Sequence, residues 1–326
     1  MRTIKVAVLT RSFGAKGGIH VNIAQISKFF PDCIDIISKG FYDDMGIPNK
    51  IIKCKNWSEV IEKIKKYDII HVHHSPENLL AALLKKRYKF KLIHTWHGVL
   101  PPKYTENFTL KSKLLFALLS HKFVFNFCDK IISVSRFLQT QVKNSCYIPN
   151  GVDTSIFKPK KIEHEKFTVL YVGAMEKFKG IHLIPQFAKK FPQIKFLLVG
   201  KGSVNFNLPN IEKRNYTPYK EIIKFYNSSD LMIRPSLYES FGIPVLEAMA
   251  CELPVIASNL PCFKEIISKG TGFCVPLNKF PQYIQYFFDN PKEVKIYGKR
   301  ARRQAKKFEW KKIAKQTFKV YEEVLT

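Results

Sequence analysis

Two glutamates, Glu239 and Glu247, frame the segment ESFGIPVLE, which follows an apolar run ending at Arg234. Gly242 allows a tight turn here, and Pro244 suits the first helical residue, where no hydrogen-bonding backbone N–H is lost. The N–H groups and the dipole at the start of a helix bind anions such as a diphosphate. Both carboxylates can accept hydrogen bonds from sugar-like hydroxyl groups. The segment therefore predicts a site for a phosphorylated, hydroxyl-rich ligand, and the simpler alternative is a surface carboxylate beside a helix cap.

Histidines cluster in two short stretches, HVHH, which begins at His71, and HTWHG, which holds His97. His97 follows an apolar run and starts a loop, a position that suits either a structural histidine or an acid–base group. Alternation along a strand puts His71 and His73 on one face and His74 on the other. Because no run of cysteines or carboxylates lies nearby to complete a set of metal ligands, we expect this first stretch to pack at a strand end.

Short runs rich in Val, Ile and Phe alternate with stretches of helical period in both halves of the chain. Continuous rather than alternating hydrophobicity is typical of strands buried on both faces of a parallel sheet. The expected strands span residues 4–10, 68–73, 91–95, 130–134, 146–149, 168–172, 195–199, 231–234 and 254–257. The expected helices span residues 19–30, 77–87, 111–127, 180–190, 219–227, 244–251 and 310–324. This alternation predicts two doubly wound α/β domains.

A polar, charged stretch after Pro149-Asn150-Gly151 separates the two halves. We expect an N-terminal Rossmann-like domain over residues 1–155 and a C-terminal Rossmann-like domain over residues 165–308. A final helix over residues 309–326 is expected to pack back toward the first domain. Ligands bind at the carboxyl ends of parallel strands, so two such domains in tandem predict a site in a central cleft that both domains face.

The chain of 326 residues is strongly basic, with 54 Lys and Arg against 26 Asp and Glu. The net charge of +28 is shared by both halves, because residues 1–150 hold 24 basic and 10 acidic side chains. This distribution excludes a detachable cationic tail and argues against intrinsic disorder. It favours anionic partners such as nucleic acid, phosphorylated small molecules or acidic lipid, although a lysine-rich proteome would produce the same charge. No aromatic–basic RNA motif or DNA-reading module is present, so a nucleic-acid partner is not expected.

The seven cysteines are widely spaced and form no C-x-x-C pair. This pattern argues against a zinc ribbon and a disulfide framework, and it fits a reducing cytoplasm. The apolar stretch of residues 114–121 is far shorter than the roughly 20 residues that span a bilayer. We therefore expect a protein that does not cross a membrane.

The longer segment PSLYESFGIPVLEAMACELPVIAS resembles the family 4 retaining glycosyltransferases, which have the GT-B fold and use nucleotide-sugars. Glu239 and Glu247 match the family's E-x7-E signature. Further landmarks follow in the family's order: Gly17-Gly18, His97-Gly98, IPNGVD, VGAMEKFKG and the terminal helix FEWKKIAKQTFKVYEEVL. The resemblance covers nearly the whole chain and is strongest over residues 145–275.

The resemblance implies that three residues bind the nucleotide part of the donor. Gly18 would allow the backbone to approach the diphosphate, because it has no side chain. Lys179 would neutralise the diphosphate as it leaves, and Glu247 would bind the ribose. Such enzymes need no metal ion or other cofactor, since lysine and arginine supply the positive charge.

The resemblance also implies which residues lie near the transferred sugar. Glu239 would hold the sugar hydroxyls, with the backbone amides of Phe241, Gly242 and Ile243 beside it. His97 would lie near the reacting sugar. Catalytic roles are therefore expected for His97 and Glu239.

One position departs from the family pattern: Ala174 stands where an arginine usually follows the glycine of V-G-R. We predict that Arg234, at the end of a neighbouring strand, supplies the missing cation to the donor. The alternative is weak donor binding or a non-catalytic relative.

A weaker signal concerns the nucleotide base. Gly202, Tyr216 and Thr217 lie where the family contacts the base, although ordinary turn chemistry explains these residues equally well. The signal does not distinguish a uridine from a guanosine or adenosine nucleotide.

Residues 109–127, TLKSKLLFALLSHKFVFNF, mix Leu and Phe with spaced lysines. Such a segment either lies in the interface of an anionic membrane or forms a core helix with one solvated face. Contact with lipid would place the enzyme at the inner face of the membrane and favour a lipid-linked or other glycan acceptor.

The resulting prediction is a cytoplasmic, hexosyltransferase-like enzyme that moves a sugar from a nucleotide-diphosphate sugar to an acceptor hydroxyl with retention of configuration. Its product would belong to a cell-surface, lipid-linked or polysaccharide glycan. The alternatives are another GT-B activity, such as an epimerase or a phosphorylase, and a non-catalytic nucleotide-sugar-binding relative.

Overall fold

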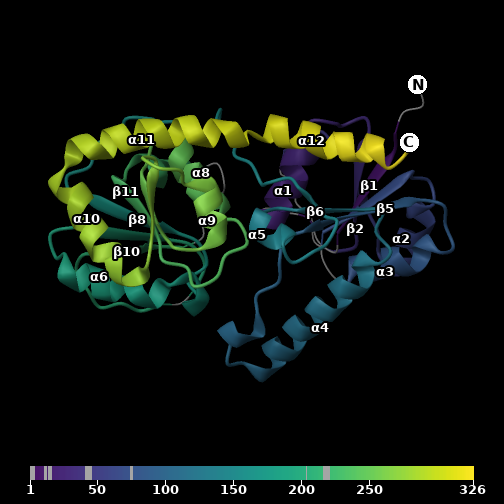
Figure 1. Ribbon diagram of the computed structural model, residues 1–326, viewed down its shortest axis with the longest axis horizontal. Helices are drawn as coiled ribbons and strands as arrows, with labels where there is room; N and C mark the ends of the chain where they lie inside the picture. The colour runs from purple at the N-terminus through teal and green to yellow at the C-terminus, as the bar shows by residue number, and fades with distance from the viewer. Residues whose placement is uncertain are drawn as a thin grey trace. The chain divides into compact units, whose positions relative to one another are not determined.

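Residues 1–150 and 310–326 form one unit of the computed structural model, and residues 151–309 form a second (Figure 1). The structure describes residues 4–10, 13, 17–40, 46–73, 76–202, 204–215 and 221–326. We call the two units unit 1 and unit 2.

Among its described residues, unit 1 contains a parallel sheet of seven strands in the order β3-β2-β1-β4-β5-β6-β7. The strands are β1 Val6–Thr10, β2 Ile34–Ser38, β3 Ile51–Lys53, β4 Ile69–Val72, β5 Lys91–Trp96, β6 Lys130–Ser133 and β7 Cys146–Tyr147. All residues of β1 and β4 are buried, as expected for central strands covered on both faces. The strand order reverses between β1 and β4, and the carboxyl ends at this reversal are where open α/β sheets bind ligands.

Helices cover both faces of this sheet. They are α1 Gly18–Ser27, α2 Trp57–Ile64, α3 Glu77–Lys85, α4 Phe108–Phe125, α5 Arg136–Gln139 and α12 Trp310–Glu323, with the short 3-10 helix η1 Pro102–Tyr104 before α4. The last helix, α12, packs against α1 in unit 1 (Figure 1), where the ring of Phe318 stacks on that of Phe30 at 4.3 Å. The end of the chain therefore completes the core of the unit that contains its beginning.

Among its described residues, unit 2 contains a parallel sheet of six strands in the order β10-β9-β8-β11-β12-β13. The strands are β8 Thr168–Val172, β9 Lys195–Val199, β10 Ile211–Arg214, β11 Leu231–Arg234, β12 Val255–Ser258 and β13 Gly272–Val275. The longer helical elements are α6 Ile184–Lys190, α7 Ile223–Asn227, α8 Ile243–Ala250, α9 Pro261–Ile266, α10 Phe280–Asp289 and α11 Pro291–Ala305. Here the strand order reverses between β8 and β11.

The two doubly wound α/β sheets predicted from the sequence are confirmed, and each predicted strand has a counterpart in the structure. Several elements were not predicted: β2, β3, β10, β13, α2, α5, α9, α10 and α11. The edge strand β10 reads IEKR and carries three charged side chains, which protect a sheet edge from pairing with another chain. It therefore lacks the continuous hydrophobic run on which the prediction depended.

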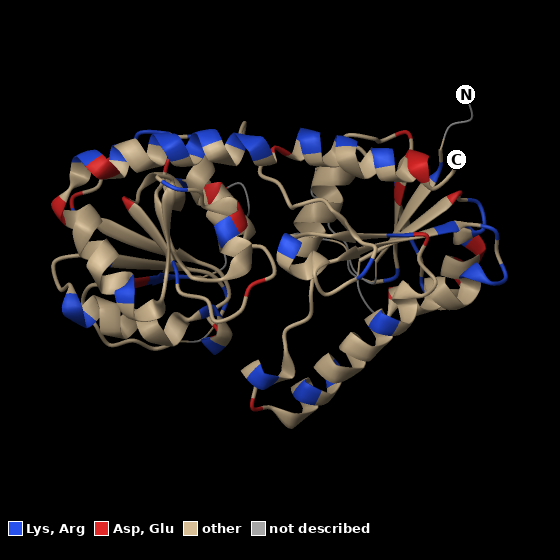
Figure 2. Ribbon diagram, in the orientation of Figure 1, with Lys and Arg blue, Asp and Glu red and all other residues tan. Residues whose placement is uncertain are grey.

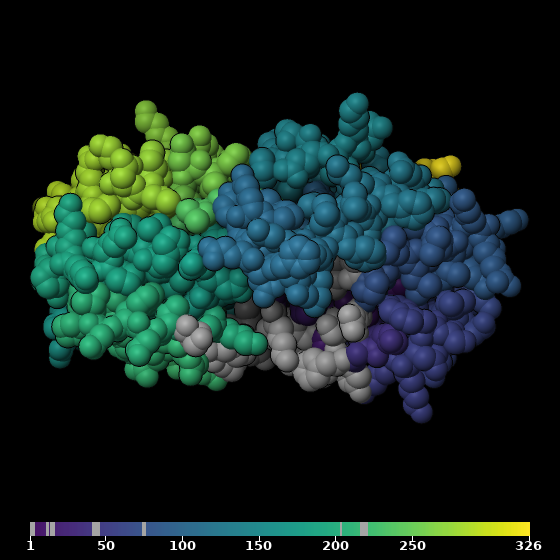
Figure 3. All heavy atoms as spheres, turned by 90° about the horizontal axis from the view of Figure 1, so that it is seen from below, coloured from purple at the N-terminus to yellow at the C-terminus, as the bar shows by residue number. Residues whose placement is uncertain are grey.

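Helix α4 carries several apolar side chains on its solvent side. Phe108, Phe116 and Leu119 are 82%, 60% and 58% exposed, whereas Ser120, His121 and Val124 near its end are buried. The helix runs outward from the sheet of unit 1 (Figure 1), and its atoms lie on the face seen in Figure 3. Of the two alternatives given for residues 109–127, a core helix with one solvated face does not account for these exposed apolar side chains.

Basic residues are distributed over helices and loops of both units (Figure 2), in agreement with the even charge of the two halves of the sequence. Within the described part of the chain, no helix is long and apolar enough to cross a bilayer.

Candidate active site

The candidate site in unit 2 lies where β8 and β11 end, at the reversal of strand order. Arg234 is the last residue of β11, and its Nη1 donates a hydrogen bond to the carbonyl oxygen of Val172, the last residue of β8. The guanidinium lies against the backbone of Gly173, because a Cβ atom placed there would come within 2.4 Å of Nη1. Arg234 therefore lies against Gly173, the residue before Ala174, which stands where the resembling family usually has an arginine.

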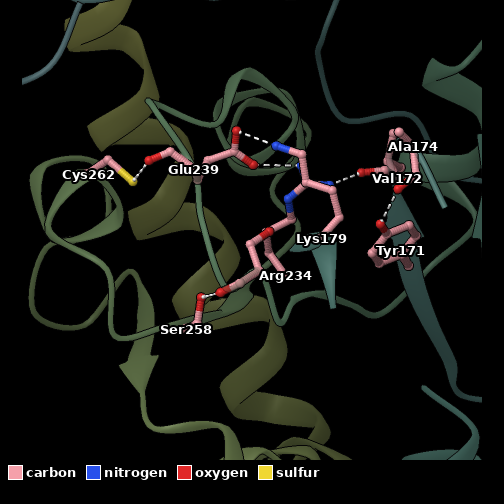
Figure 4. Close-up of polar contacts among 9 residues, drawn as sticks. Tyr171, Val172, Ala174, Lys179, Arg234, Glu239, Ser258 and Cys262 are labelled. Carbon is pink, nitrogen blue, oxygen red and sulfur yellow. Dashed lines mark hydrogen bonds and ion pairs between the residues drawn. The ribbon is translucent and has the colours of Figure 1, made fainter. Parts of the chain in front are cut away.

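Three charged side chains meet at this edge (Figure 4). The carboxylate of Glu239 accepts from Lys179 Nζ at 2.8 Å on Oε1 and from Arg234 Nη2 at 2.7 Å on Oε2. The side chains of Lys179, Glu239 and Arg234 are 16%, 11% and 4% exposed. We call these three residues the charged triad. Two cations on one carboxylate leave a net positive charge in a largely desolvated place, which is suited to binding an anion.

Backbone contacts bring the distant parts of the charged triad together. The amide of Leu237 donates to the carbonyl oxygen of Phe178 at 2.8 Å, which joins the Glu239 loop to the turn that carries Lys179. Gly180 follows that turn with a φ of +77°, and a Cβ atom there would come within 1.9 Å of the carbonyl oxygen of Pro235. Only glycine allows this close approach, so the position of Lys179 depends on it.

The carboxylate of Glu239 points inward between two cations (Figure 4), so the alternative of a surface carboxylate is wrong for this residue. Burial alone would raise the pKa of Glu239, but Lys179 and Arg234 outweigh it and lower the value to about 2. Burial lowers the pKa of Lys179, and Glu239 offsets part of that effect. The carboxylate of Glu239 is therefore ionised over the whole physiological pH range.

The segment after Glu239 turns into helix α8. Gly242 is its N-cap with a φ of +104°, and a Cβ atom there would come within 2.7 Å of the ring of Phe263. Phe241 and Ile243 are buried, with the ring of Phe241 packed edge-on against Phe308. Their side chains thus anchor the turn, and the start of α8 belongs to the same segment as the charged triad.

Glu247 lies in the second turn of α8 and is buried. Its Oε2 accepts a hydrogen bond from the hydroxyl of Tyr226, on α7, at 2.7 Å. Burial raises the pKa of Glu247 to about 7, and the hydrogen bond from Tyr226 opposes only part of this rise. The two signature glutamates are therefore in opposite electrostatic environments although they belong to one short segment.

The residues predicted for the nucleotide base are only partly described. Gly202 follows β9, and its neighbour Lys201 accepts a backbone hydrogen bond from Met175 in the loop after β8. Tyr216 and Thr217 lie outside the described residues. The base contact stays a prediction.

In unit 1, the predicted residues lie at the carboxyl edge of the sheet or just after it. Gly18 is the first residue of α1 and is exposed at the N-terminus of that helix. His97 directly follows β5 and is buried, and its Nε2 lies 3.0 Å from Nδ1 of His73, which follows β4. His71 and His73 stack with centroids 4.5 Å apart, so the predicted shared face is confirmed, while His74 lies outside the described residues.

Sequence reasoning missed three partners in these sites: Tyr226 for Glu247, His73 for His97, and Tyr321 for His71. The two histidines follow β4 and β5, which are neighbours in the sheet, so their proximity depends on a strand order that the sequence does not show. No sequence signal indicates Tyr226 or Tyr321. Among the described residues, no group of three or more His, Cys, Asp or Glu side chains is arranged to hold a metal ion.

Comparison with known protein families adds two consecutive matches. Residues 2–156 match the model of glycosyltransferase family 4, and residues 152–304 match that of the glycosyl transferases group 1. Together they cover nearly the whole chain. The chain belongs to glycosyltransferase family 4. It is therefore an enzyme that transfers sugars from nucleotide-sugars, and the charged triad lies in the half matched by the second model.

This glycosyltransferase has relatives of similar length. An uncharacterized glycosyltransferase of Methanocaldococcus jannaschii is 28% identical, with 94% of this chain and 95% of the relative covered. The O-antigen biosynthesis glycosyltransferase WclY of Escherichia coli is 29% identical over 68% of this chain and 69% of its own. The crystal structure of HepE from Anabaena in complex with UDP-glucose superposes with a TM-score of 0.83 at 17% identity, covering 98% and 100% of the two chains. The two sheets of the glycosyltransferase thus form the GT-B fold.

Proposed function

We propose that this glycosyltransferase moves a sugar from a nucleotide-diphosphate sugar to an acceptor hydroxyl with retention of anomeric configuration, in the synthesis of a cell-surface, lipid-linked or polysaccharide glycan. The observation that carries the proposal is the charged triad at the strand reversal of unit 2, with the start of α8 in the same segment. The O-antigen relative from Escherichia coli supports a glycan product. The free cysteines fit a reaction in the cytoplasm.

In this proposal, unit 2 binds the donor. Lys179 contacts the diphosphate, and Arg234 supplies the positive charge that Ala174 lacks. Glu239, held by both cations, accepts hydrogen bonds from the hydroxyls of the sugar. Glu247 binds the ribose. The backbone amides at Phe241, Gly242 and Ile243 add donors that cost little reorganisation, because the buried side chains fix the turn.

The transfer step breaks the bond between the anomeric carbon and the diphosphate oxygen, and the electron pair leaves with the diphosphate. A hydroxyl of the acceptor forms the new bond on the same face, and its proton passes to the departing phosphate. Lys179 stabilises the negative charge that develops on the leaving group. His97 of unit 1 acts near the reacting sugar, and Gly18 allows the backbone to approach the diphosphate. No metal ion is needed, so the rate should be unchanged in EDTA.

The first experiment measures donor binding by calorimetry with UDP-, GDP- and ADP-sugars. We expect one nucleotide-sugar to bind the wild type, and Lys179→Met to weaken that binding about 10- to 100-fold, since a hydrogen bond to a charged group contributes about 1.5 to 3 kcal/mol. Lys195→Met is the matched control, because Lys195 also pairs with a glutamate, Glu212, but at an exposed site. Binding that ignores Lys179, or the absence of binding by every donor, would contradict the proposal.

Turnover distinguishes the transferase from its alternatives. The wild type should release the nucleoside diphosphate from the donor at a rate independent of inorganic phosphate. A requirement for phosphate would indicate a phosphorylase. Binding of the donor without transfer of its sugar to water or to any glycan acceptor would indicate a non-catalytic relative.

The exposed face of α4 supports a second part of the proposal, contact with an anionic membrane. Apolar side chains recur along the helix at positions that share one face spanning about 100°. These exposed residues are Phe108, Leu115, Phe116, Leu119 and Phe123, whereas the exposed Leu110 lies outside this face. Lys111 and Lys122 border this stripe and are exposed. An apolar stripe with lysines at its edge fits the interface of a membrane that contains acidic lipid, and this contact would place the enzyme beside a lipid-linked acceptor.

Vesicle flotation tests the membrane contact. We expect the wild type to float with vesicles of phosphatidylcholine and phosphatidylglycerol and to stay in solution with phosphatidylcholine alone. The double variant Phe116→Ser and Leu119→Ser should lose flotation. Ile296→Ser is the control, since it removes one exposed apolar side chain of a helix in unit 2. Equal flotation of wild type and double variant would rule out α4 as the membrane contact.

A further inference from the structure

Three histidines form a row at the carboxyl edge of the sheet in unit 1. The ring of His71 stacks on that of His73 with centroids 4.5 Å apart and an interplanar angle of 30°. The ring of His73 in turn stacks on that of His97, at 5.3 Å and 24°. All three residues are buried. The row therefore runs from the interior of unit 1 to the residue that directly follows β5.

The inner end of the row is held in place by hydrogen bonds on both ring nitrogens of His71. Nδ1 lies 2.8 Å from the hydroxyl of Tyr321, on α12, and Nε2 lies 2.8 Å from the hydroxyl of Thr95, on β5. Burial lowers the pKa of His71 to about 3, so its ring is neutral. A neutral ring bonded on both sides cannot rotate without breaking two buried hydrogen bonds. His71 thus gives His73 a fixed surface on which to stack.

The outer pair shares one proton. Nδ1 of His73 and Nε2 of His97 are 3.0 Å apart, a hydrogen-bond distance at which one nitrogen donates and the other accepts. When His73 donates, His97 accepts on Nε2 and carries its own proton on Nδ1. When His73 accepts, His97 carries its proton on Nε2. The tautomer of His97 is therefore coupled to that of His73, as the partner of a ring nitrogen generally selects the tautomer.

We infer that His73 is a positioning residue that fixes the ring orientation and the tautomer of His97 for the reaction of the donor sugar. The inference rests on the proposed function, because His97 is assigned there to the reacting sugar. His73 itself need not touch substrate. Its effect should fall on the rate of the chemical step rather than on donor binding, since the donor is held by residues of unit 2.

Two substitutions separate the hydrogen bond from the packing. His73→Phe keeps an aromatic ring for stacking and removes the shared proton, whereas His73→Asn keeps a polar group near the position of Nδ1. We expect His73→Phe to lower kcat for nucleotide release about tenfold or more, with the KM for the donor changed less than about twofold, and His73→Asn to recover much of the loss. A His73→Phe variant with wild-type kcat would overturn the inference.

The matched control is His94→Phe. His94 is another buried histidine of the same sheet, and its Nε2 lies 3.0 Å from Nδ1 of a different histidine, His121. Loss of a buried histidine pair in general would lower kcat in both variants equally. An equal loss would therefore overturn the inference, and a loss confined to His73→Phe would support it. The thermal midpoints of both variants should be measured as well, so that turnover is assayed at a temperature at which both are folded.

A second measurement does not depend on turnover. Nitrogen NMR of the full chain labelled with [¹⁵N]histidine reports which ring nitrogen of each histidine carries the proton, with His97→Gln used to assign the signals of His97. We expect one tautomer of His97 in the wild type and a mixture in His73→Phe. Unchanged ring-nitrogen shifts of His97 would overturn the inference. Absence of nucleotide release from the wild type would instead contradict the proposed function, and the NMR result would still decide the coupling.

Discussion

The carboxyl edges of the two sheets use opposite means to hold buried polar groups. In unit 2, the edge carries the charged triad, with Glu239 between Lys179 and Arg234. In unit 1, it carries a row of histidines, of which His71 has hydrogen bonds to neutral hydroxyl groups on both ring nitrogens. Desolvated charges persist only when they are paired, whereas a neutral imidazole needs only hydrogen bonds.

The same contrast explains two pKa values that are lowered for different reasons. The pKa of Glu239 is about 2 because two cations outweigh its burial, and that of His71 is about 3 because burial disfavours the charged ring. Unit 2 therefore presents a fixed positive site to an anion. Unit 1 presents buried imidazole rings that are held by hydrogen bonds.

The two edges also respond to acid in different pH windows. A depressed pKa contributes stability above the ordinary value and loses it as the pH falls toward the value in the folded state. For His71 this loss begins near its ordinary value of 6.5, and for Glu239 it begins near 4.5. Acidification should therefore destabilise unit 1 before it affects the charged triad.

The largest expected effect comes from removing the charge of Glu239. Glu239→Gln leaves Lys179 and Arg234 without an anion, and we expect the free energy of unfolding to fall by about 3 to 5 kcal/mol, the usual cost of removing one partner of a buried pair. Urea unfolding measures the change. Glu212→Gln is the control, since that glutamate pairs with Lys195 and Arg214 near the surface and should change stability by less than about 1 kcal/mol. Similar losses in both variants would refute the contrast between a buried and an exposed network.

The next effect concerns which residue supplies the second positive charge to the donor. Arg234→Ala should weaken donor binding about 10- to 100-fold, measured by calorimetry with the donor that binds the wild type. Ala174→Arg added to that variant should restore most of the affinity, because the guanidinium of Arg234 lies against the neighbouring Gly173. Unchanged affinity in the single variant would exclude Arg234 from donor binding. If the double variant binds the donor no better than Arg234→Ala does, the role of Arg234 is limited to its ion pair with Glu239.

A smaller effect tests the neutral edge of unit 1. Tyr321→Phe removes the hydroxyl that bonds His71 Nδ1 at 2.8 Å, and we expect a loss of about 1 kcal/mol in the free energy of unfolding, typical of one neutral hydrogen bond. Tyr283→Phe is the control, since the ring that packs on Phe273 is retained. A loss as large as that of Glu239→Gln would mean that unit 1 also depends on charge at its edge.

Much of the fold followed from the sequence because buried parallel strands leave continuous apolar runs. Strands β8 and β9 were predicted with their observed bounds, since all but one of their residues are buried. The short edge strand β3 and the charged edge strand β10 were missed, because a strand paired on one side needs no such run. The helix of residues 111–127 was predicted, but which of its faces is buried was not, because apolar residues occur all around it.

The chemistry of the site was less predictable than its location. The motif around Glu239 marked the loop, but Lys179 lies 60 positions earlier, and only the folded backbone shows that the two side chains form an ion pair. The stacking of His71 on His73 followed from strand alternation, while the bond from His73 to His97 required the pairing of two strands. Residue types thus indicated the chemistry, and long-range contacts decided the charge state of each group.

The smallest effect should come from Glu247, a buried carboxyl with a hydroxyl partner instead of a cation. Its pKa of about 7 lies above the ordinary value of 4.5, so its protonated form stabilises the fold below pH 4.5, and that contribution is lost as the pH rises through 7. Glu247→Gln keeps an acceptor for Tyr226 and removes this titration. The thermal midpoint of Glu247→Gln minus that of the wild type should therefore be roughly 2 to 4 °C larger at pH 8 than at pH 5.5.

The donor affinity of the wild type should rise from pH 5.5 to pH 8, because the ionised carboxylate of Glu247 accepts hydrogen bonds from ribose hydroxyls better. The variant Glu247→Gln should bind the donor weakly at both pH values. A wild-type affinity independent of pH would remove Glu247 from the ribose site and leave the charged triad as the sole support for donor binding in unit 2.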